Sequence, residues 1–140
     1  STPVIEGLAD ANITEGYHNL SHHGKAEDKR AQLTVLDTWH FKLLANLLSG
    51  MKGTAEGDET LLDRTMVVYG SNFGDANKHS TTNMPVILAG GGFKHGQHLA
   101  FDTELNYPLP NLFVSMLNRL GLDEETFVSS TGTMRGLEMT

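Results

Sequence analysis

The sequence predicts an α/β fold in which a mostly parallel sheet is covered by helices, as a single domain over residues 1–140. Two segments, 65–69 and 84–89, predict buried strands, and each is a continuous apolar run rather than an alternating one. Continuous runs are typical of strands that are covered on both faces, as in parallel sheets. Two amphipathic segments, 25–51 and 109–120, supply the helices for that cover.

The chain opens with a segment of weak periodicity, 1–19, which we expect to be extended or irregular. The histidine-rich segment 17–24 overlaps its end and holds three of the seven histidines. A long helix is expected over 25–51, where Glu27 and Asp28 suit the positive end of the helix dipole. The predicted apolar face of this helix consists of Leu33, Leu36, His40, Leu43, Leu47 and Met51.

Between this helix and the first strand, residues 52–63 have the acidic, glycine-bearing composition of a surface loop. The two strands enclose a polar loop, and three glycines follow the second strand. Residues 97–101 are then expected to form a short edge strand. The second helix, over 109–120, has Pro110 in its first turn and Gly121 as its C-terminal cap.

Composition excludes several classes of function. The chain has 17 acidic and 10 basic residues and no basic stripe, so nucleic acid is not an expected partner. No segment is apolar and long enough to predict a membrane span, and no signal peptide is visible. The absence of cysteine excludes disulfides and thiolate ligands, so any metal ion would be held by His, Asp, Glu or Asn.

The histidine-rich segment has the spacing of a metal-binding pair. His22 follows His18 by four positions, so in a helix or one tight turn both imidazoles point to the same side and can share a metal ion. His23 would point elsewhere, where it is available to contact a metal ligand or a substrate. The alternative is that the cluster is polar surface ahead of the helix.

The polar loop between the strands holds a further histidine, His79, which is placed to supply a third imidazole. The alternative for its ring is a hydrogen bond to a backbone carbonyl. Asn72 and Asp75 are candidate ligands or substrate contacts in the same loop, but Asn and Asp commonly cap and shape turns, and we favour that role. His95, after the glycines, either lines the same predicted site as these loop residues or faces solvent.

Two stretches of the chain, LSHHGK and ETLLDRTMVVYGSNFGDANKHSTTNMPVILAGGGFKHGQH, resemble the bacterial domain of unknown function DUF1552. They also resemble the related DUF1501 proteins, and both groups are similar to the alkaline phosphatase/sulfatase superfamily. The resemblance runs over residues 16–132 and corresponds to the C-terminal part of such a protein. It implies an alkaline phosphatase-like fold and a longer parent protein whose N-terminal half carries the nucleophile and the first Asp ligand.

The resemblance also implies one divalent metal ion, zinc or manganese, held by His18, His22 and His79. His18 stands where the superfamily has an Asp, and His23 is the alternative to His22 for the second position. The superfamily holds a second metal with an adjacent Asp-His pair after the core strand. Here that place is occupied by Asn72-Phe73, in which Phe cannot ligate a metal and neutral Asn is a poor substitute.

The activity implied is metal-dependent hydrolysis of phosphate or sulfate esters by the parent protein, with this fragment alone inactive. Its expected partners are the missing N-terminal half of the same protein and an anionic small-molecule substrate. The resemblance also implies a secreted bacterial protein with a periplasmic or other extracytoplasmic location. The alternative, favoured by Asn72-Phe73, is a non-catalytic binding or structural domain of an extracytoplasmic protein. A simple metal-binding module without esterase chemistry is the third hypothesis.

Overall fold

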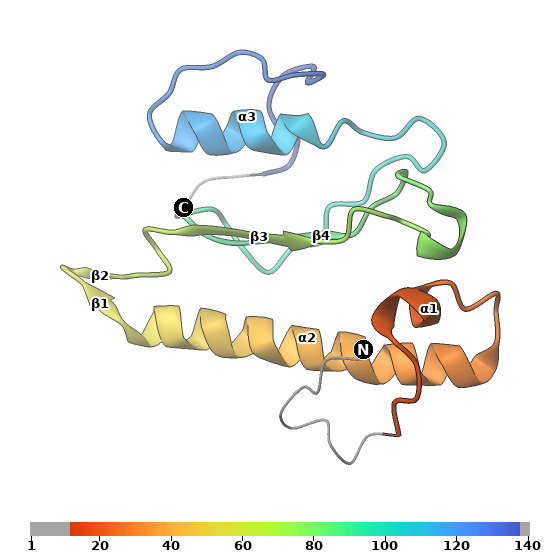
Figure 1. Ribbon diagram of the computed structural model, residues 1–140. Helices are drawn as coiled ribbons and strands as arrows, with labels where there is room; N and C mark the ends of the chain where they lie inside the picture. The colour runs from red at the N-terminus through yellow and green to blue at the C-terminus, as the bar shows by residue number, and fades with distance from the viewer. Residues whose placement is uncertain (1–11, 138–140) are drawn as a thin grey trace. The chain divides into compact units, whose positions relative to one another are not determined.

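The computed structural model describes residues 12–137 (Figure 1). This part of the chain contains three α-helices, one 3-10 helix and two separate two-stranded antiparallel sheets. In chain order the elements are α1 (Tyr17–Ser21), α2 (Glu27–Gly53), β1 (Ala55–Glu56), β2 (Glu59–Thr60), β3 (Met66–Gly70), η1 (Ala76–Lys78), β4 (Val86–Gly90) and α3 (Pro110–Arg119).

The long helix α2 confirms the helix expected after the histidine-rich segment. It has 27 residues, and Glu27 and Asp28 occupy its first turn, where carboxylates interact favourably with the helix dipole. Leu36 is buried, whereas Leu43 and Leu47 of the predicted apolar face are about half exposed. Among the described helices, α2 included, none combines the length and the apolarity that crossing a membrane requires.

The predicted mostly parallel sheet is wrong. β3 and β4 form an antiparallel pair in which Val68 lies opposite Leu88, and the only other sheet in the described residues is the small β1–β2 hairpin. A parallel pair needs a crossover connection, usually an α-helix, but the segment 71–85 contains only the short helix η1. Continuous apolar runs therefore did not require two covered faces here, and Val68 is 39% exposed.

Smaller differences concern the segments on either side of these strands. The loop expected over 52–63 contains the β1–β2 hairpin, and the edge strand expected over 97–101 is wrong, because those residues have no regular structure. β4 begins at Val86, directly after a proline that has no N–H to donate to the sheet. The second predicted helix is confirmed as α3, with Pro110 at its first position.

The chain divides into two compact units, each described by itself. The first unit comprises Ser1–Ser49 and Asn72–Met84, and the second comprises Gly50–Ser71 and Pro85–Thr140. Among the described residues of the first unit, the buried side chains are Leu20 of α1 and Leu36 of α2. In the second they are Phe93 and three residues of α3, Asn111, Leu112 and Val114. The sequence prediction that both units form one domain stays a prediction.

Candidate metal centre

Helix α1 places two histidines side by side in the first unit. Leu20 anchors this short helix because its side chain is completely buried. The backbone N–H of His22, the C-cap residue, donates to the carbonyl oxygen of His18. The two imidazole rings meet edge to face with their centroids 4.7 Å apart. The four-residue spacing thus brings both rings to one side of α1, as the sequence predicts.

The loop between β3 and β4 is shaped by a capped turn that positions His79. The carboxylate of Asp75 accepts hydrogen bonds from the backbone N–H groups of Asn77 and Lys78 and thereby caps η1. His79 ends η1 with a left-handed backbone, φ 52°, which is uncommon for a residue other than glycine. Asp75 therefore shapes the turn, the role favoured from the sequence, and its Oδ1 is already an acceptor of two N–H groups.

The rings of His22 and His79 are in contact although the residues are 57 positions apart. Their Nε2 atoms are 3.1 Å apart, and their rings stand edge to face with centroids separated by 4.7 Å. The ring of Phe73 also stacks on that of His79, with the two centroids 5.3 Å apart. His18, His22 and His79 therefore form a row of three imidazoles with His22 in the middle; we call these three residues the imidazole row.

The surroundings of His22 favour its neutral form. Desolvation is the largest cause, followed by the nearby His79 and then His18, and together they hold the pKa of His22 below its ordinary value of 6.5. Partial desolvation disfavours the charged form of the imidazole, because water hydrates the charge less well. The two neighbouring imidazoles repel that charge when they are themselves protonated. The neutral imidazole is also the form that binds a metal ion.

The distance between the Nε2 atoms of His22 and His79 fits two neighbouring ligand positions around a small divalent ion. With metal–nitrogen bonds of about 2.05 Å, two ligand nitrogens are separated by about 3.3 Å in tetrahedral and about 2.9 Å in octahedral geometry. The observed 3.1 Å between the two Nε2 atoms lies between these values. In their present rotamers, however, no three His, Asp or Glu side chains of residues 12–137 form a group that could hold a metal ion.

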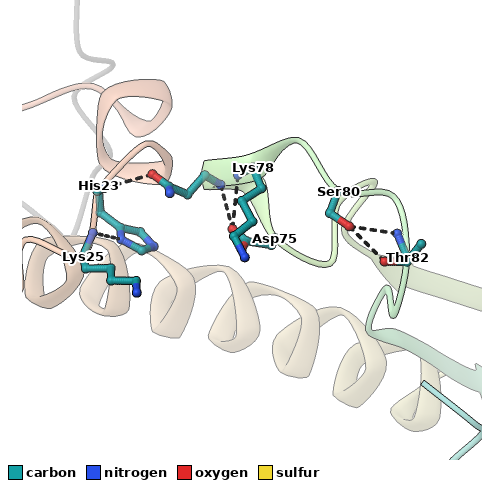
Figure 2. A network of polar contacts seen from close by, with 8 residues as sticks. His23, Lys25, Asp75, Lys78, Ser80 and Thr82 are labelled. Atoms are coloured by element: carbon teal, nitrogen blue, oxygen red, sulfur yellow. Dashed lines mark hydrogen bonds and ion pairs between the residues drawn. The ribbon is translucent and has the colours of Figure 1, made fainter. Parts of the chain in front are cut away.

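The other predicted site residues have different surroundings. His23 accepts a hydrogen bond at Nδ1 from the backbone N–H of Lys25, 2.9 Å away, so this nitrogen is engaged in shaping the start of α2 (Figure 2). The ring that contacts both His18 and His79 is that of His22. Asn72 is exposed. His95 belongs to the second unit, where its Nε2 lies 3.0 Å from the carbonyl oxygen of Gly90.

One residue of the site is not identified by sequence reasoning. The side-chain oxygen Oδ1 of Asn77 accepts a hydrogen bond of 2.9 Å from the backbone N–H of Gly24, across 53 positions of the chain. The sequence marks Asn77 only as a polar residue of the loop. Nothing in its spacing or composition pairs it with the turn before α2.

Comparison with protein-family models, with curated proteins and with solved structures finds no match for this chain. The resemblance to DUF1552 and to the alkaline phosphatase/sulfatase superfamily therefore stays a prediction, as do the ester hydrolase activity and the extracytoplasmic location that it implies.

Proposed function

We propose that this chain binds one divalent transition-metal ion through His22 and His79, with His18 as the third ligand. The observation that carries the proposal is the 3.1 Å separation of two imidazole nitrogens from residues that are distant in the chain. The fold already holds two of the ligands close together, so the ion does not have to order them. Much of the entropy cost of forming the site is therefore met by folding rather than by binding.

The third ligand requires a change in the rotamer of one side chain. His18 is exposed, and its ring centroid is already 4.7 Å from that of His22. Exposed side chains exchange between staggered rotamers within nanoseconds, so the present orientation of His18 does not prevent its ring from reaching an ion at His22 and His79. Three protein ligands are the usual set around a zinc ion that keeps one position open for water or an anion.

The chemistry of the row favours zinc over manganese. Imidazole nitrogen suits zinc, copper, nickel and iron, whereas manganese is better held by carboxylates and water. The one carboxylate of the loop 71–85, that of Asp75, is occupied by the backbone of η1 and by a long ion pair with Lys78 at 3.9 Å. A bound zinc ion would supply a Lewis acid at the open position, while the three imidazoles of this chain would hold and orient it.

Metal binding, rather than ester hydrolysis, is the function that the geometry supports. The hydrolase hypothesis depends on a nucleophile from the N-terminal half of a parent protein and on a superfamily fold with a parallel sheet. The antiparallel pairing of β3 and β4 removes the support of that fold. No distance or contact in the described residues singles out a nucleophile beside the row.

The test is calorimetric titration of the 140-residue chain with zinc and, separately, with manganese. We expect one zinc ion per chain and much weaker manganese binding. His22→Ala and His79→Ala should each lower zinc affinity by more than the roughly 10–100-fold that loss of an outer-shell partner costs, and His18→Ala should lower it less. His98→Ala, which removes an exposed histidine of the second unit, is the matched control.

Two results would contradict the proposal. One is that the wild-type chain does not bind zinc. The other is that His22→Ala and His79→Ala bind zinc as tightly as His98→Ala, which would assign the binding to histidines outside the row.

A further inference from the structure

Two polar contacts join the same pair of segments in the first unit. One is the contact between the rings of His22 and His79, and the other is the hydrogen bond from the Gly24 N–H to Oδ1 of Asn77. Gly24 follows His22 by two residues, and Asn77 precedes His79 by two residues. The second contact therefore lies directly beside the first.

The backbone of Asn77 is held in place by local hydrogen bonds, which orient its side chain. The backbone N–H of Asn77 donates to Oδ1 of Asp75 at 3.0 Å, within the capped turn of η1. On the other side, Gly24 has φ 54°, a left-handed conformation that glycine adopts at little cost. The amide oxygen and the N–H that meet here are thus both held by local structure before they pair.

The two contacts differ in how they respond to a metal ion. The ring contact is a hydrogen bond only when one Nε2 carries a proton and the other has a free lone pair. A metal ion held by both Nε2 atoms takes both lone pairs and removes that hydrogen bond. The bond between Asn77 and Gly24 uses no ring nitrogen, so it is unaffected by the tautomers of the rings and by a bound ion.

We infer that Asn77 is a positioning residue, which holds His79 against His22 through its hydrogen bond to Gly24. Its effect on metal affinity rests on the function proposed above, but its effect on the spacing of the two rings does not. Residues that orient metal ligands commonly contribute roughly 10–100-fold to metal affinity.

The experiment compares Asn77→Ala with the near-isosteric Asn77→Asp, whose carboxylate can still accept from Gly24. Asn46→Ala, which removes an exposed asparagine from the body of α2, is the control. Zinc affinity is measured by calorimetry at high ionic strength, where the negative charge that Asn77→Asp adds is screened. The spacing of the rings is measured without metal, as the nuclear Overhauser effect between ring protons of His22 and His79.

We expect Asn77→Ala to lower zinc affinity by about tenfold or more and to weaken the Overhauser effect, while Asn77→Asp and Asn46→Ala retain both. The inference is overturned if Asn77→Ala keeps wild-type affinity and an unchanged Overhauser effect. If Asn77→Ala does not fold, Asn77→Asp decides, because a folded Asn77→Asp chain without the Overhauser effect contradicts the inference. A wild-type chain that shows the Overhauser effect but binds no zinc contradicts the proposed function alone, and the comparison of ring contacts still tests Asn77.

Discussion

At the scale of single residues, the candidate site depends most on His22, because its ring contacts those of both His18 and His79. The contact with His18 follows from local spacing and is predictable from the sequence. The contact with His79 agrees with the convergence that the sequence suggests, but its geometry depends on the fold of a loop 57 positions away. The bond between Asn77 and Gly24 is not predictable, since its partners form no local pattern.

The lowered pKa of His22 predicts a pH dependence of stability. In the unfolded chain this imidazole has its ordinary value of 6.5, and in the folded chain a lower one. Between the two values the unfolded state binds more protons, so the free energy of unfolding rises with pH in this window. The contribution of His22 to the free energy of unfolding is present above pH 6.5 and is lost as the pH falls through the lower pKa of the folded state.

An NMR titration of the ring protons of His22 tests this prediction. Desolvation, the largest cause of the shift, and then the charge of His79 both lower the pKa. His79→Ala removes that charge and part of the side-chain packing that desolvates His22, so the titration midpoint of His22 should move up toward 6.5. His98→Ala should leave it in place. A midpoint of 6.5 or above in the wild-type chain would be at odds with the described contacts.

At the scale of elements, the sequence predicts positions better than pairing. The helices α2 and α3 follow from amphipathic periodicity with capping residues, and they begin and end within two residues of the predicted positions. The strands β3 and β4 are also located by their apolar composition. Their antiparallel pairing was missed because apolar composition reports burial and not direction. The absence of a helical pattern in the connection 71–85 was the better indicator of an antiparallel pair.

The turn η1 gives a prediction that separates a capping role of Asp75 from a ligand role. Asp75→Ala removes the acceptor of two backbone N–H groups and should lower the free energy of unfolding by about 1 kcal/mol, with weaker zinc binding because His79 is displaced. Asp75→Asn keeps a capping oxygen, and the exposed ion pair with Lys78 that it loses contributes little. We therefore expect Asp75→Asn to retain both stability and zinc affinity.

Denaturant unfolding and zinc titration of the two Asp75 variants provide the measurements. Asp75→Asn is the matched control for the loss of the cap, because it removes the charge and exchanges one carboxylate oxygen for an NH2 group but keeps an oxygen that can accept from η1. If Asp75→Asn loses zinc affinity as strongly as His79→Ala while its stability is unchanged, the carboxylate is a metal ligand and the capping role is not its main one.

At the scale of the whole molecule, the imidazole row lies entirely in one of the two compact units. His18 and His22 come from the first segment of that unit, and His79 comes from its second segment, Asn72–Met84. An ion bound to all three would link two segments that are distant in the chain and would stabilise the folded state by mass action. The formal net charge of -7 also favours the approach of a cation over that of an anion.

X-ray absorption at the zinc edge tests the central claim most directly, because it reports the ligands of the ion itself. For the zinc-loaded wild-type chain we predict imidazole scattering from three ligands, with zinc–nitrogen distances of about 2.0–2.1 Å. One of the three should be lost in His79→Ala. A first shell made only of oxygen atoms, or an imidazole signal that His79→Ala leaves unchanged, would contradict the claim that the row binds the metal.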